Sequence, residues 1–97
     1  MNRQPTHPGA VLREDVLPAM AGMSVAGLAR ALHLSRQTVH GLLNESKPVT
    51  ANIALRLGKF IGNGPGIWLR MQEAHDLWKT EQEIADELGE IEEYRAA

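Results

Sequence analysis

Hydrophobic residues recur along the chain at helical spacing, and each run is bounded by residues that start or stop helices. The first run begins at Pro8 and extends to about Val16, and Pro18 is predicted to end it. A second helix is predicted after Ser24, a good N-cap residue, and should end at His33. Alternating segments between hairpin turns are lacking, so we expect no β-sheet.

Hydroxyl side chains mark the start of the next two predicted helices. Ser35 caps a third helix, which should end within Asn44 to Lys47, before a proline. Thr50 caps a fourth helix, and the sequence Gly62-Asn63-Gly64 is predicted to end it. The gap between the second and third helices is very short, so these two helices must pack at a tight turn.

A fifth helix is predicted to begin at Pro65 and to reach Lys79 or beyond. Its expected core face consists of Ile67, Trp68, Met71, Ala74, His75 and Trp78. Leu69 falls on the opposite side, among Gln72, Glu73, Asp76 and Thr80. An apolar residue in a polar field is a candidate contact to a second copy or to a partner protein, although single exposed leucines are common.

The five helices predict an all-α domain over residues 1–80, followed by an acidic extension, residues 81–97, that is helical or frayed. The chain has 97 residues and no cysteine, which fits one domain and excludes disulfide scaffolds, cysteine-ligated metal centres and thiol catalysis. It has no long apolar run of the membrane-spanning or signal-peptide type, so we expect a cytoplasmic protein with no membrane contact.

Charge is distributed unevenly along the chain. Residues 1–70 hold eight Lys and Arg residues against three acids, a formal charge of +5, whereas residues 71–97 hold two against nine, a charge of −7. A basic body suggests a polyanionic partner, and an acidic tail suggests a cationic partner or a solubilising chain end.

The segment from Ser24 to Asn44 has the features of a helix-turn-helix motif. Two short helices flank a tight turn, and the small Ala29 stands in the first helix where the second must cross it. His33 occupies the turn, where a left-handed conformation is needed, and histidine tolerates that conformation better than most residues.

The outer face of the third helix carries the candidate DNA-reading residues. A core side of Val39, Leu42 and Leu43 leaves the other face free of acids. Four side chains there can contact base edges in a major groove: Arg36, Gln37, Thr38 and His40. Three more are placed for phosphates: Ser35, Asn44 and Lys47. Gly41 is predicted on the same face, allowing the helix to approach the groove closely.

No set of residues indicates an enzyme, a metal site or a cofactor. The four histidines lie apart in sequence: His33 and His40 flank a turn without a neighbouring carboxylate, His7 lies near the chain end, and His75 is on the predicted core face. No Gly-x-Ser-x-Gly nucleophile elbow is present, and the glycines of residues 62–66 lack the strand that a phosphate-binding loop requires.

The motif resembles the Xre/Cro-type helix-turn-helix of the lambda-repressor-like fold, with Leu28, Ala29, Leu34, Ser35, Val39 and Leu42 at the characteristic positions. A wider resemblance, over residues 7–79, is to the HigA-type (VapI) antitoxins. It rests on His7-Pro8-Gly9, on Pro48-Val49-Thr50 through Ala54-Leu55-Arg56-Leu57, and on Trp68-Leu69-Arg70-Met71-Gln72 with Ala74 and Asp76-Leu77-Trp78.

This resemblance implies a type II antitoxin that neutralises a small, basic, ribosome-dependent mRNA endonuclease of the HigB type. It also implies a homodimer that represses its own operon at a palindromic operator. By position, Arg36, Gln37, Thr38 and His40 would contact bases, while Ser35 and Asn44 would contact phosphates.

Two positions depart from the pattern of related repressors. Val25 replaces a glutamine that often contacts a phosphate, and Gly41 replaces a residue that often reads a base. Two alternatives remain open at this stage: a stand-alone Xre-family transcriptional regulator without a toxin, and a helical protein-interaction module.

Overall fold

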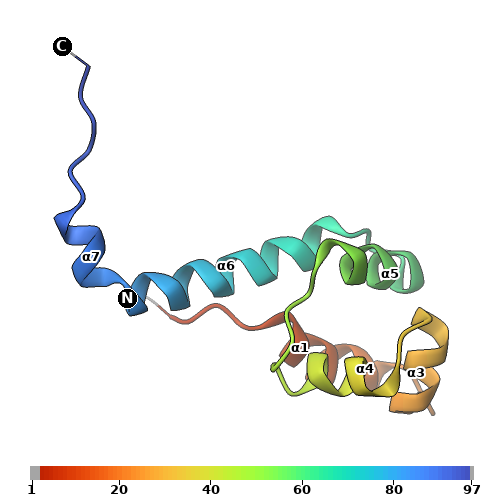
Figure 1. Ribbon diagram of the computed structural model, residues 1–97. Helices are drawn as coiled ribbons and strands as arrows, with labels where there is room; N and C mark the ends of the chain where they lie inside the picture. Colours follow the sequence, from red (N-terminus) through yellow and green to blue (C-terminus); the bar gives the residue numbers. More distant parts are fainter. Residues whose placement is uncertain (1–2, 97) are drawn as a thin grey trace.

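The computed structural model describes residues 3–96, which form helices and no strand, so the predicted all-α fold is confirmed (Figure 1). The molecule measures 59 × 24 × 24 Å, because a compact body continues into a projecting arm. In chain order the elements are α1 (Pro8–Val11), the π-helix η1 (Leu12–Val16), α2 (Leu17–Ala19), α3 (Val25–Leu32), α4 (Arg36–Leu43), α5 (Ala51–Ile61), α6 (Gly66–Glu83) and α7 (Ala85–Glu90).

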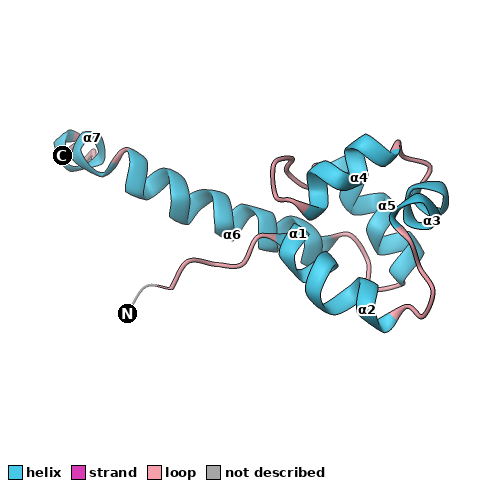
Figure 2. Cartoon of the chain, turned by 90° about the horizontal axis from the view of Figure 1, so that it is seen from below, coloured by secondary structure: helices cyan, strands magenta, loops and turns pink. Residues whose placement is uncertain are grey.

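The prediction that Pro18 ends the first helix is wrong. The chain stays helical through Ala19, because α1 widens into the π-turn η1 and then continues as α2 (Figure 2). The Leu17 N–H bonds to the Leu12 carbonyl, which is a π-type pairing, and Pro18 falls in the first turn of α2. A proline has no N–H to donate, so the chain passes Pro18 without a bond from that position and leaves the helical conformation at Met20.

The core lies where α3, α4 and α5 meet the base of α6. Trp68 is the largest fully buried side chain and anchors α6 to this core. The other core members are Leu12, Leu28, Ala29, Leu32, Val39, Leu42, Leu43, Val49, Ile53, Ala54 and Leu57. The buried face of α4, with Val39, Leu42 and Leu43, is therefore the one predicted from spacing.

Two glycines allow backbones in the body to touch. A Cβ on Gly9 would lie 1.8 Å from the Leu42 carbonyl oxygen, so α1 packs directly on the end of α4. A Cβ on Gly58 would lie 2.2 Å from the Gly64 carbonyl carbon, where α5 crosses the turn into α6. Larger residues at either position would push helices apart, so these glycines fix the positions of α4 and α6.

The predicted core face of α6 is only partly correct. Ile67 and Ala74 are exposed, whereas Gln72, which was placed on the polar side, is buried. Both ends of the Gln72 amide are hydrogen-bonded, because its Oε1 accepts a 2.7 Å bond from the Val49 N–H and its Nε2 donates to Asp76 at 2.9 Å. Burial of a polar group costs little when it is hydrogen-bonded in this way, and periodicity alone does not reveal such a pair.

The distal part of α6 and α7 form the arm, which leaves the body and carries residues 91–96 as extended chain (Figures 1 and 2). α6 continues past Lys79 to Glu83, and α7 follows after a break at Ile84. No side chain of α7 is buried. Within residues 3–96, none of the helices combines the length and apolar character that crossing a membrane requires.

Candidate nucleic-acid interface

The helix-turn-helix is built by local hydrogen bonds around a tight turn. Ser24 caps α3 by accepting the Gly27 N–H at 3.0 Å. His33 ends that helix in the left-handed conformation, with φ 57° and ψ 43°, as predicted. The Leu34 N–H then returns to the Ala29 carbonyl at 2.9 Å, which satisfies an end carbonyl of α3 and directs the chain into α4.

Arg56 of α5 holds this turn from outside the motif. Its guanidinium donates to the carbonyl oxygens of Leu32 and His33, at 2.9 and 3.2 Å, and to the Asn52 side chain at 2.7 Å. A cation at the C-terminal end of α3 also complements the helix dipole. From the sequence alone, Arg56 is one base of the basic body and one residue of the family resemblance, and no contact is predicted for it. Its spacing of four residues from Asn52 was the available signal of an ordered side chain.

The outer face of α4 carries the predicted base-reading residues at the molecular surface. Arg36, Gln37 and His40 are exposed, and Thr38 is half-buried. Val39 and Leu42, on the other side of the same helix, are completely buried. α4 therefore presents guanidinium, amide and imidazole groups outward from a backbone that the core holds in place.

Ser35 and Thr38 form a reciprocal cap at the start of α4. The Ser35 hydroxyl accepts the Thr38 N–H at 3.0 Å and donates to the Thr38 hydroxyl at 2.8 Å. The Ser35 hydrogen is thus used inside the protein, while Thr38, the acceptor, can direct its own hydroxyl hydrogen outward. The capped end of α4 still offers the N–H groups of its first turn to an anion.

Gly41 lies in a different environment from the one predicted. It is buried, and a Cβ there would be 2.7 Å from the Lys47 Cγ, so the alkyl chain of Lys47 lies directly over it. Its carbonyl accepts the backbone N–H groups of Ser46 and Lys47, at 2.9 and 3.0 Å. The glycine therefore makes room for Lys47 rather than for a DNA groove. This packing brings Lys47, which is exposed, beside α4.

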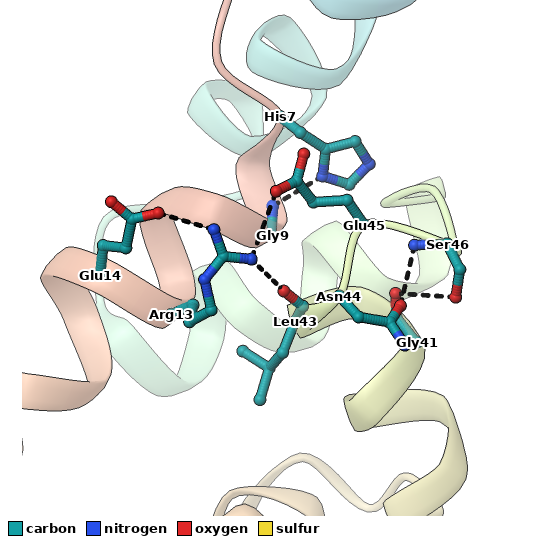
Figure 3. Close-up of polar contacts among 9 residues, drawn as sticks. All are labelled: His7, Gly9, Arg13, Glu14, Gly41, Leu43, Asn44, Glu45 and Ser46. Atoms are coloured by element: carbon teal, nitrogen blue, oxygen red, sulfur yellow. Dashed lines mark hydrogen bonds and ion pairs between the residues drawn. The ribbon is translucent and has the colours of Figure 1, made fainter.

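The loop that follows α4 positions Asn44 at the helix end. The Asn44 Oδ1 accepts the Ser46 N–H at 3.0 Å, and its backbone N–H bonds to the His40 carbonyl (Figure 3). The amide group of Asn44 has its oxygen engaged in this loop, which orients the Nδ2 donor. An exposed donor at the end of α4 is suited to a phosphate oxygen.

Arg13 forms ion pairs with two of the three acids of the body, Glu14 and Glu45 (Figure 3). It bonds Glu14 at 2.6 Å and Glu45 at 3.2 Å, and it also donates to the Leu43 carbonyl at the end of α4. The side-chain hydrogen bonds to Glu14 and Glu45 raise the pKa of Arg13 above its ordinary value. Because Glu45 adjoins the predicted phosphate-binding residues, this pairing weakens the repulsion that its carboxylate would exert on DNA. Periodicity did not reveal the contacts of Arg13 with Leu43 and Glu45, which lie 30 and 32 residues away.

His7 is buried, although it lies near the N-terminus of the sequence. Its Nδ1 accepts the Gly9 N–H at 2.9 Å and so caps α1 (Figure 3). The imidazole packs edge-on against His75 of α6, with ring centroids 4.9 Å apart, and His75 Nδ1 lies 3.0 Å from the Pro5 carbonyl oxygen. Burial, and then the neighbouring His75, lower the pKa of His7 below its ordinary 6.5.

Together these contacts make α4 a rigid element with a polar outer face. Its two ends are capped, its inner face is buried, and its position is set by Arg56 on one side and by Gly9 and Arg13 on the other. The exposed groups match the donors and acceptors of base edges and phosphates. Such a helix can enter a major groove with little loss of conformational freedom.

No protein-family model matches the chain. Virulence-associated protein I of Dichelobacter nodosus is 43% identical over 77 residues, which cover 79% of this chain and 70% of that protein. Antitoxin HigA-1 of Vibrio cholerae is 36% identical over 85 residues, 88% of this chain and 79% of that protein. The solved structure of antitoxin GraA in complex with its operator has a TM-score of 0.86 and 39% identity, and the match covers 99% of this chain and 97% of that one. The chain therefore belongs to the HigA-type (VapI) antitoxin family of helix-turn-helix proteins.

Proposed function

We propose that the protein is an antitoxin that represses its own operon by binding operator DNA through α4, and that neutralises a small, basic toxin of the HigB type. The exposed outer face of α4, free of acids and held on a buried backbone, is the observation that carries the DNA-binding part. GraA, which shares the fold, has been solved on its operator.

Within this proposal, Arg36, Gln37, Thr38 and His40 contact base edges. Lys47, Asn44 and the capped N-terminus of α4 at Ser35 contact phosphates. Residues 1–80 act as the DNA-binding domain, and residues 81–97 act as an acidic extension. Binding should weaken steeply as salt rises, because each phosphate contact displaces counterions.

A homodimer is needed for strong specificity, since one α4 reads only a few base pairs and two related by a two-fold axis match a palindrome. We place Leu69 at the contact between copies. It is 37% exposed and shares the outer side of α6 with Leu77, around a hollow of about 390 Å³. The segment from residue 66 to 79 has two bases and two acids, so two copies can approach without net repulsion. Leu69→Glu should lower the mass of the dimer in solution.

We also propose that the protein is a binding protein and not an enzyme, working in the cytoplasm where its operator lies and using no cofactor or metal. His7 and His75, the two histidines in mutual contact, hold α1 against α6 and are engaged in the fold.

The test is to express the chain with the neighbouring short reading frame and to measure co-purification together with binding to the upstream promoter at two salt concentrations. A stable complex that binds the promoter in a salt-sensitive way is the expected result. Promoter binding without a partner would indicate a stand-alone regulator. Loss of both activities would indicate a protein-interaction module instead.

A further inference from the structure

The arm carries an apolar hollow of its own, away from the DNA-reading face. It has a volume of about 380 Å³ and is lined by Leu77, Trp78, Thr80, Glu81, Ile84 and Leu88. It forms where α6 ends, because Ile84 leaves the helical conformation at φ −116° and ψ 22° and α7 starts in a new direction. Both figures of the whole chain place this joint at the far end of the molecule from α3 and α4 (Figures 1 and 2).

The hollow lacks the contacts that a buried apolar cluster normally has. Leu77 and Leu88 are 65% and 41% exposed, and beyond them Ile91 and Tyr94 are more exposed still. The Trp78 Nε1 group is shielded from solvent and has no hydrogen-bond partner among the described residues. Apolar residues gathered on a projecting element are typical of a surface that a partner covers.

Charge decides which kind of partner fits. From Leu77 to Tyr94, a stretch that includes the whole lining of the hollow, the chain has seven acids and one base, Lys79. A second copy would bring an equally acidic arm against this one, and like charges in an apolar interface cost free energy. A basic surface would be attracted to it instead.

We propose that this hollow binds a cationic, amphipathic segment of a partner protein. Apolar side chains of that segment fill the space between Trp78, Ile84 and Leu88, and its Lys or Arg side chains pair with the acids along the rim, such as Glu81. The inference rests on the proposed antitoxin function, in which this partner is the toxin, and it assigns the toxin to the arm.

Separation of the two surfaces has a direct consequence. α4 lies on the body and the hollow lies on the arm, so a bound partner leaves the outer face of α4 uncovered. The protein can then hold the partner and operator DNA at the same time, and the complex should still bind the promoter.

The experiment compares two exposed leucines in the full-length chain, one in the hollow and one outside it. Leu88→Asp places a charge in the hollow, and Leu55→Asp is the matched control, because Leu55 is 60% exposed on α5 and lies outside the hollow. The probe is the basic protein encoded by the neighbouring reading frame, titrated by calorimetry at low and high salt. Promoter binding by each variant is measured in parallel.

Leu88→Asp should weaken partner binding by about tenfold or more, while Leu55→Asp leaves it unchanged and both variants keep promoter binding. Higher salt should also weaken the wild-type complex with the partner. Equal partner affinity in Leu88→Asp and the wild type would overturn the inference, as would a loss of dimer mass in Leu88→Asp. Failure of the wild-type chain to bind the partner at all would instead refute the antitoxin function and, with it, this assignment.

Discussion

The body and the arm of this protein achieve their helical structure by different means. In the body, α3, α4 and α5 bury one face each, and glycines such as Gly9 and Gly58 let backbones touch. In α7 no side chain is buried, and a Cβ added at Gly89 would meet nothing within 4 Å. The body is held by tertiary packing, whereas the distal arm depends on local helix formation.

The body and the arm also differ in how their acidic residues are paired with bases. Body acids are compensated, since Arg13 pairs with Glu14 and Glu45, while the arm has acids without bases between residues 80 and 94. This difference separates two kinds of recognition in one short chain. A rigid, positively charged element suits a fixed duplex, and an adaptable acidic one suits a basic protein.

The largest effect should come from a methyl group added to the body. Gly9→Ala is expected to lower the free energy of unfolding by about 3 kcal/mol, because the new Cβ meets the Leu42 carbonyl and forces α1 off α4. Gly89→Ala in the arm is the control and should stabilise the helix slightly. Urea unfolding of both variants makes the comparison, and equal stabilities would show that α1 and α4 are not closely packed.

The next effect concerns DNA. Gln37→Ala should cost about 1 to 3 kcal/mol of binding at one base pair of the operator, because we propose that this exposed amide contacts a single base edge. Arg36→Ala should lower affinity in the same way at another base pair of the operator.

Lys47→Ala should weaken binding to all DNA sequences alike and reduce the salt dependence of binding. These effects are measured with a panel of single-base operator variants. A uniform loss for Gln37→Ala would contradict its base-reading role.

A smaller effect should appear when the pH falls. Since the pKa of His7 is lowered in the folded protein, the unfolded chain binds the proton more tightly, and stability should fall as the pH drops through 6.5 toward the folded pKa. Protonation also removes Nδ1 as acceptor of the Gly9 N–H. The titratable and charged groups that act on His7 are His75, Glu45, Asp76 and Arg13.

Melting temperatures between neutral and mildly acidic pH test this prediction. His7→Asn keeps a capping side chain and should flatten the pH dependence of the melting temperature. An unaltered slope in His7→Asn would assign the pH dependence to other groups.

The smallest effect should follow removal of the arm's distal part. Truncation after Thr80 is expected to change the free energy of unfolding by less than about 1 kcal/mol, because no residue from 81 to 96 is fully buried. Thermal unfolding of the truncated and full-length chains measures the difference. A large loss of stability would show that the arm belongs to the folding unit of the body.

The sequence predicted what depends on local chemistry and periodicity. Ser24, Ser35 and Thr50 cap helices as expected, His33 adopts the left-handed turn, and the inner face of α4 is buried. Contacts between distant segments were not predictable in this way. Periodicity gave no sign that Lys47 would cover Gly41 or that Gln72 would be buried against Val49. Nor did periodicity indicate that the helix would continue past Pro18. It continues through the π-turn η1, in which the Leu17 N–H bonds to the Leu12 carbonyl.

The division of α4 into a buried and an exposed side has an evolutionary consequence. Val39 and Leu42 determine whether the helix folds and packs, whereas Arg36, Gln37 and His40 project into solvent. If the exposed residues contact bases as proposed, substitutions among them alter the preferred operator at almost no cost in stability. Duplicated copies of such a gene could diverge to separate promoters one surface residue at a time, without passing through an unfolded intermediate sequence.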